Sequence, residues 1–267
     1  MPPPAADAPC PEQAFNATAL KWHTCAWLLL PVLVFLTGWM HWYAALPLTL
    51  LTAAGLTPRE SKEPQTRDSL PAFPLFTRSS FLALAAFAAL MALSGWGEWV
   101  NQHPDHIVRN ACLRELVASP WPVIFPDGNV LIYNTGFWLV PALAGKLAGL
   151  DAARVLVVLW GTWGLFLSWL WLCVFSGRRS LLLALLMAAF GSLLNVQCWL
   201  GLDLFRLHYF GTAEQIMCSA NASIPVLLFF IFLASGRMPL YWMPILFAAT
   251  AFYSPLAALG GLPLAAC

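Results

Sequence analysis

The ionisable side chains with the most potential for chemistry gather in one stretch, residues 96–126. Only 9% of the chain is charged. Within 18 positions, however, the stretch contains Glu98, His103, Asp105, His106, Arg109, Arg114 and Glu115. The stretch directly follows the apolar run at 81–96, so it is expected to lie at a membrane surface. A cluster of this kind forms either a solvated loop or a functional site.

Asp105 stands at the centre of this stretch, after His103 and Pro104 and before residues with helical spacing. One interpretation makes Asp105 a helix N-cap, because a carboxylate there accepts backbone N–H groups. The other makes it a catalytic residue. Desolvated by neighbouring tryptophans, its carboxylate would act as a general base and take a proton from an acceptor hydroxyl. The residues leave both interpretations open.

His106 and Arg109 are spaced to share a helix face with Asp105. Guanidinium groups suit phosphate oxygens, so Arg109 and Arg114 could bind the phosphate of a lipid-linked substrate. The alternative is that both arginines anchor the chain to lipid headgroups. Glu98, at the end of the preceding helix, is interpreted as an interfacial residue.

A second polar loop is expected at residues 197–223, where Arg206, His208 and Glu214 are candidates for substrate binding. The alternative for part of this loop is an amphipathic surface helix, because apolar residues recur there at helical spacing. If both polar stretches face the same side of a membrane, Cys112 and Cys218 could form a disulfide.

The composition of the chain predicts which kind of secondary structure carries these residues. The chain is 60% hydrophobic with a mean hydropathy of +0.73, whereas soluble domains carry roughly 25% charged residues. The sequence therefore predicts a polytopic α-helical membrane protein. Its net charge of +1 argues against a nucleic-acid partner. Tryptophans near the predicted helix ends, Trp27 and Trp96 among them, are expected to be interfacial anchors.

Residues 1–20 are rich in Pro and Ala and are predicted to be a disordered tail, followed by a transmembrane domain at 21–267. That domain is divided into a helical hairpin at 25–56, a basic cytoplasmic linker at 57–79 and a core at 80–267. The chain stops inside apolar sequence, and the core is therefore expected to be C-terminally incomplete. Spans of the core are expected at 81–96, 155–175, 181–195, 224–234 with its flanks, and from 240 onward with a break at Ser254-Pro255. Residues 129–149 either span the membrane or lie on its surface.

Asp105-His106, Arg114-Glu115-Leu116, Trp121, Pro122 and Pro126 together resemble the first outer loop of GT-C-type glycosyltransferases. Residues 136–154 are similar to the second surface helix of that family, which favours the surface interpretation of 129–149. The sequence Tyr253-Ser254-Pro255-Leu256-Ala257 is similar to bacterial multi-span proteins of unassigned activity in this group. The common second acidic residue of the family is His106 here.

The resemblance implies an all-α polytopic transmembrane helix bundle with amphipathic surface helices on its outer face. The implied activity is sugar transfer from a polyprenyl-phosphate donor to an acceptor at the non-cytoplasmic face of a bacterial inner or plasma membrane. Asp105 would be catalytic, and the substrate-binding residues would be His106, Arg109, Arg206, His208 and Glu214. No cofactor is expected, a divalent metal ion is left open, and a partner subunit is a further possibility.

Two alternatives come from other classes: a transporter or channel subunit, and a non-catalytic membrane partner protein. Transporters place charged residues within their spans. The spans predicted here hold essentially no ionisable groups, which favours chemistry at the surface over transport.

Overall fold

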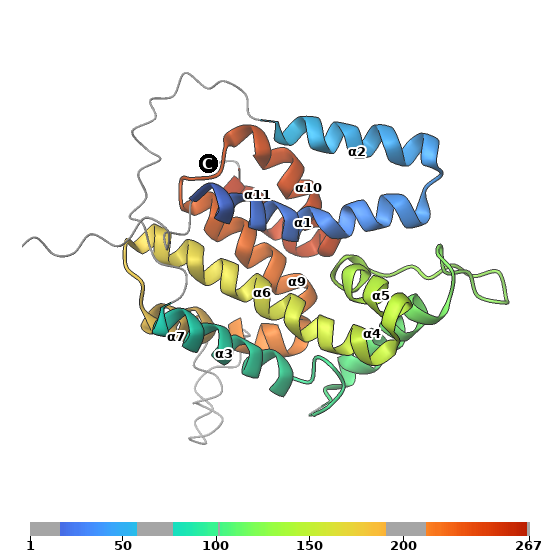
Figure 1. Cartoon of the computed structure of the whole chain (residues 1–267), viewed down its shortest axis with the longest axis horizontal. Coiled ribbons are helices and arrows are strands. Elements are labelled where there is room, and N and C mark those ends of the chain that lie inside the picture. Colours follow the sequence, from blue (N-terminus) through green and yellow to red (C-terminus); the bar gives the residue numbers. More distant parts are fainter. Residues whose placement is uncertain (1–16, 58–76, 101, 191–211, 266–267) are drawn as a thin grey trace, which may run out of the picture.

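The computed structural model describes residues 17–57, 77–100, 102–190 and 212–265, and this part of the chain is built from helices (Figure 1). The first six are α1 (Ala17–Trp39), α2 (Trp42–Leu56), α3 (Arg78–Leu93), α4 (Pro104–Ala118), α5 (Gly136–Ala148) and α6 (Leu150–Ser176). They are followed by α7 (Leu181–Ala189), α9 (Thr212–Ala234), the short 3₁₀ helix η3 (Leu240–Trp242), α10 (Met243–Tyr253) and α11 (Pro255–Ala265). The predicted all-α class is confirmed.

Within the described residues, α1, α6 and α9 are long and apolar enough to cross a membrane. Their length and composition support the membrane character predicted for the chain. The span expected at 81–96 lies three residues earlier than predicted, since α3 begins at Arg78, has 16 residues and ends at Leu93. Its length of about 24 Å falls below the roughly 30 Å of a hydrocarbon core. The helix ends there because Gly95 and Gly97 adopt positive φ angles of 91° and 123°, which glycine tolerates best.

Other boundaries also differ from the expected ones. Helix α1 begins at Ala17, inside the predicted tail. Helix α7 ends at Ala189, and the remainder of the span expected at 181–195 lies mostly outside the described residues. Helix α9 begins at Thr212, so the loop predicted at 197–223 is wrong over its last 12 residues. Residues 212–223 include Ala, Glu, Gln and Met, which have high helix propensity. The predicted break at Ser254 is confirmed.

The core is centred on α6, which packs against α1, α3, α5 and α9. The Trp27 ring stacks between Trp160 and Tyr253, with ring centroids 5.1 and 5.3 Å away. The Tyr253 hydroxyl donates a hydrogen bond of 2.7 Å to the Trp27 carbonyl. Trp27 is therefore a buried core residue, and its interpretation as an interfacial anchor is wrong.

The helical body has two ends of different charge. At one end, drawn on the left of Figure 1, Arg179 contacts Thr77 and the Trp242 indole donates to the Leu56 carbonyl. The described ionisable side chains at this basic end, histidine aside, are Lys21, Arg78, Arg178, Arg179 and Arg237. At the opposite end lie α4, α5 and the start of α6. The described acidic residues all belong to this mixed-charge end: Glu98, Asp105, Glu115, Asp127, Asp151 and Glu214.

Replacement of Gly164 by Ala is expected to destabilise the core. An added Cβ would lie 2.6 Å from Ile224 and 2.7 Å from the Trp27 ring, and Trp27 is fixed by its stacking partners. Overpacking of this kind costs about 1–3 kcal/mol, measurable as a lower thermal midpoint in detergent. Gly161→Ala is the matched control, because its nearest contact is the flexible end of Met91. A smaller effect at Gly164 than at Gly161 would contradict this account of the core.

Candidate functional site at the mixed-charge end

Helix α4 carries Asp105 and begins with a cap different from the one predicted. Pro104 is the first helical residue, and the N-cap is His103, whose Nδ1 accepts a hydrogen bond of 3.3 Å from the Asp105 backbone N–H. Pro suits the first helical position because its φ is already helical. The interpretation of Asp105 as an N-cap is therefore wrong: Asp105 stands two positions after the N-cap, in the first turn of α4.

The Asp105 carboxylate is accessible, with 53% of the side chain exposed. Its Oδ2 lies 3.6 Å from Arg109 Nη2, which confirms the predicted shared face for this i,i+4 pair. The expected desolvation of Asp105 by tryptophan is wrong, because Trp96 packs against His106 and Arg109 instead. Asp105 is thus a surface carboxylate oriented by one arginine.

His106 points into the protein and is 1% exposed. Its Nε2 lies 2.9 Å from the carbonyl oxygen of Met217 in α9, so this nitrogen carries the proton. The prediction that His106 shares the face of Asp105 is wrong, because adjacent residues of a helix point about 100° apart. His106 connects α4 to α9, and Nδ1 is buried without a hydrogen-bond partner among the described residues.

Arg109 is also buried, at 8% exposure. Its Nη2 donates to the Ser219 hydroxyl at 3.3 Å, and its guanidinium carbon lies 5.7 Å from the centre of the Trp96 ring. Its Nε and Nη1 atoms are buried and have no acceptor within the described part of the chain. Because an unsatisfied buried donor is costly, these two nitrogens would gain from a hydrogen-bond acceptor.

The first part of α9 supplies the contacts that hold Trp96, His106 and Arg109 in place. The Trp96 indole donates to the Ile216 carbonyl at 2.8 Å, and α9 departs from helical geometry at Ser219, with φ −151° and ψ 45°. Glu214 lies half-buried in the first turn of α9. The structure thus brings the two polar stretches together. Of the remaining candidates, Arg206 and His208 lie outside the described residues.

The cysteines of the two stretches do not pair. Cys112 and Cys218 are both free, so the possible disulfide is not formed. Burial raises the pKa of the Cys112 thiol to about 12, which keeps this side chain protonated and unreactive at neutral pH.

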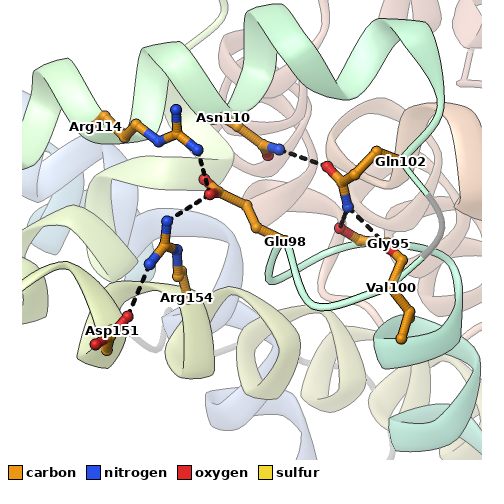
Figure 2. A network of polar contacts seen from close by, with 8 residues as sticks. All are labelled: Gly95, Glu98, Val100, Gln102, Asn110, Arg114, Asp151 and Arg154. Carbon is orange, nitrogen blue, oxygen red and sulfur yellow. Dashed lines mark hydrogen bonds and ion pairs between the residues drawn. The ribbon is translucent and has the colours of Figure 1, made fainter.

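Glu98 forms an ion cluster that the sequence did not predict (Figure 2). Its side chain is only 8% exposed. Its Oε2 accepts from Arg114 of α4 and, at 2.6 Å, from Nη2 of Arg154 in α6. Arg154 also donates to Asp151 at 2.8 Å. Glu98 therefore has a structural role beyond an interfacial position, because this carboxylate joins the loop after α3 to two helices.

The loop around Glu98 has a backbone conformation that is rare for residues with a side chain. Glu98 has a φ of 67°, in the left-handed region that residues with a side chain seldom adopt. The Gln102 amide donates to the carbonyls of Gly95 and Val100 and accepts from Asn110 at 2.7 Å. Figure 2 shows these side chains closing the loop onto α4. Gly95 and Gly97, which precede Glu98, are the feature of the sequence that indicates such a tight turn.

The ambiguous segment at 129–149 begins as an extended loop and ends in α5. Val130 pairs with Ile124 across a turn, and α5 has 13 residues, about 20 Å and too short to cross a hydrocarbon core alone. Lys146 of α5 donates to the Ser119 carbonyl at 2.5 Å and lies 4.9 Å from the centre of the Trp121 ring. The helical part of the segment, α5, packs against α4 and α6.

Neither a set of metal-ligand side chains nor comparison with known proteins assigns an activity to this site. Among the described residues, no group of three or more His, Cys, Asp and Glu side chains is placed to hold a metal ion. No protein family, curated protein or solved structure matches this chain.

The buried His106 predicts a pH-dependent stability. Burial lowers the pKa of its imidazole below the ordinary value of 6.5; Arg109 and His103 act in the same direction, against the Met217 carbonyl and Asp105. The unfolded chain therefore binds more protons in this range. Stability from neutral His106 is present above about pH 6.5 and is lost as the pH falls toward the lower folded-state pKa.

Between pH 7.5 and pH 5, the thermal midpoint of the wild type is thus expected to fall further than that of His106→Gln, whose side chain does not titrate. Thermal unfolding of both proteins in detergent at the two pH values is the measurement. An equal fall in the two proteins would contradict the assignment.

Proposed function

We propose that the protein is a membrane glycosyltransferase-like enzyme of GT-C type. It transfers a sugar from a polyprenyl-phosphate donor to an acceptor at the non-cytoplasmic face of the membrane. The observation that carries the proposal is the pair formed by Asp105 and Arg109. An accessible carboxylate stands beside a buried guanidinium that has two nitrogens without acceptors in the described part of the chain.

In this proposal each member of the pair has one role. Asp105 takes the proton from the acceptor hydroxyl as its oxygen attacks the anomeric carbon of the donor sugar. The bond from that carbon to the phosphate oxygen breaks, and the polyprenyl phosphate leaves with the bond's electron pair. Arg109 stabilises the negative charge that develops on the departing phosphate. His106 positions Arg109 by docking α4 on α9, and Glu214 is assigned to acceptor binding.

The distribution of charge supports the proposed sidedness. Lys and Arg predominate at the cytoplasmic ends of membrane helices, and the basic end lies opposite Asp105. The distribution also disfavours a transporter or channel subunit. In the described membrane-length helices the Asp, Glu, Lys and Arg residues lie in or next to the terminal turns: Lys21, Asp151, Arg154 and Glu214.

The test uses the purified full chain in lipid vesicles, a polyprenyl-phosphate sugar with a radioactive label, and a membrane-impermeant hydroxyl acceptor added outside. Labelled acceptor is the expected product when Asp105 faces outward, and none is expected from vesicles of the reverse orientation. Failure to form product from a panel of polyprenyl-phosphate sugars would contradict the proposal and favour a non-catalytic partner protein.

A further inference from the structure

The outward face of α4 beside Asp105 is apolar. Ile107 and Val108 are 70% and 59% exposed, and Pro104 and Ala111 are exposed as well. Residues three or four positions apart are neighbours on the surface of a helix, so Val108 borders Asp105 and Ile107 borders Ala111. Pro104, Ile107, Val108 and Ala111, the apolar patch of α4, thus cover the outside of the first eight residues of the helix and end at the Asp105 carboxylate.

The apolar patch is confined to the Asp105 end of α4. On the same face, Ala111 is followed three and four positions later by Arg114 and Glu115, and Arg114 donates to the Glu98 carboxylate. A helix that rests on a bilayer along its whole length keeps one apolar face from end to end. The outward face of α4 changes from apolar to charged after Ala111, which favours a ligand at Asp105 over a general contact with lipid.

Asp105 separates the apolar patch from Arg109. The buried guanidinium of Arg109 lies 3.6 Å from Asp105 Oδ2 and has two nitrogens without acceptors in the described part of the chain. In a direct displacement, the attacking oxygen and the leaving oxygen lie on opposite faces of the sugar carbon. Because Arg109 is assigned to the leaving phosphate, the acceptor occupies the other side of Asp105, where the apolar patch lies.

We propose that the acceptor is an amphiphile, with a hydroxyl that contacts Asp105 and a hydrocarbon part that lies on the apolar patch of α4. This inference rests on the proposed sugar transfer and names the class of its acceptor. The hydroxyl proton passes to Asp105, the hydroxyl oxygen bonds to the anomeric carbon, and the polyprenyl phosphate leaves with the electron pair of the broken bond. Ile107 and Val108 determine specificity, because their burial against hydrocarbon favours an acceptor that carries a chain.

The first experiment locates the hydrocarbon part without any turnover. The full chain in phosphatidylcholine vesicles receives dodecyl glucoside with a photoreactive diazirine in its chain. A parallel sample receives the same amount of phosphatidylcholine with the same diazirine. After irradiation, peptide mass spectrometry measures the labelling of residues 104–111. The glucoside is expected to label these residues several-fold more than the phospholipid does. Equal labelling by the two probes would assign the apolar patch to bulk lipid and overturn the proposal.

The second experiment measures the selectivity of transfer, as the ratio of kcat/KM for dodecyl glucoside to kcat/KM for methyl glucoside. In the double variant Ile107→Ser with Val108→Ser this ratio is expected to fall about 10-fold, the usual effect of losing a buried aliphatic contact. Leu147→Ser is the control, since Leu147 of α5 is 84% exposed and lies outside the patch; it should keep the wild-type ratio. Partition of the dodecyl chain into the bilayer is the same for all three proteins and cancels.

Failure of this proposal is distinguishable from failure of the sugar transfer. Absence of product from both glucosides in the wild type would contradict the sugar transfer and, with it, the amphiphilic acceptor. Product from both glucosides, with an unchanged ratio in the double variant, would overturn the amphiphilic acceptor alone. The roles proposed for Asp105 and Arg109 would then stand.

Discussion

Replacing Asp105 by Asn is expected to reduce sugar transfer by about 10²–10⁴-fold, the usual contribution of a general base. The amide has nearly the shape of the carboxylate but cannot take the acceptor proton at neutral pH. The Asp105 side chain is half-exposed but its partner Arg109 is buried, so a modest loss of stability is expected beside the loss of turnover. The measurement is the turnover number of the purified variant in vesicles.

Asp151→Asn is the control for this variant. Asp151 is another acidic residue of the mixed-charge end, with 91% of its side chain exposed, and it contacts Arg154 rather than Arg109. Its replacement removes the same charge from the same end and should leave turnover unchanged. A folded Asp105→Asn protein with full activity would exclude Asp105 as the base, and equal losses in both variants would indicate a general effect of charge.

Replacing Glu98 by Gln is expected to destabilise the protein by about 2–3 kcal/mol. Loss of one partner from a buried ion pair costs about 3–5 kcal/mol. The lower figure applies because Arg114 is 54% exposed and remains partly solvated. Arg154, at 23% exposure, loses its buried counter-ion, and the Gln side chain brings an N–H₂ group toward two guanidinium cations. The thermal midpoint in detergent should fall by several degrees.

Asp151→Asn again supplies the comparison, since Asp151 belongs to the same ion cluster but is exposed. Its loss should change stability by less than about 0.5 kcal/mol. A second test removes the positive partner: in Arg114→Gln with Glu98→Gln, the penalty of Glu98→Gln should be smaller than in the wild type. If Glu98→Gln is as stable as the wild type, the buried cluster does not hold the loop in place.

The local parts of this architecture could be predicted from the sequence. The apolar run at 155–175 located α6, and the i,i+4 spacing of Asp105 and Arg109 predicted their contact. The break at Ser254 followed from the proline after it. Each of these features depends on residues within a few positions of one another, where the helical period determines which side chains meet.

The features that were missed depend on partners far away in the chain. Nothing near Glu98 indicates Arg154, 56 positions later, and nothing near His106 indicates the Met217 carbonyl. The inward orientation of Trp96 arises in the same way, because its indole N–H finds the Ile216 carbonyl in α9. Hydropathy placed this tryptophan at an interface, since a count of apolar residues carries no information on which carbonyls a distant helix leaves available.

The break in α9 at Ser219 has a mechanical consequence. In a straight helix the carbonyls of residues 216 and 217 would accept from the N–H groups of residues 220 and 221, and Ser219 interrupts the helix between these two sets. Trp96 and His106 donate to these two carbonyls. The break in α9 therefore lies beside the two carbonyls that contact Trp96 and His106. Straightening α9 at Ser219 would redirect these two carbonyls and weaken their contacts with Trp96 and His106, so we expect a displacement of α4 to be coupled to the geometry of α9.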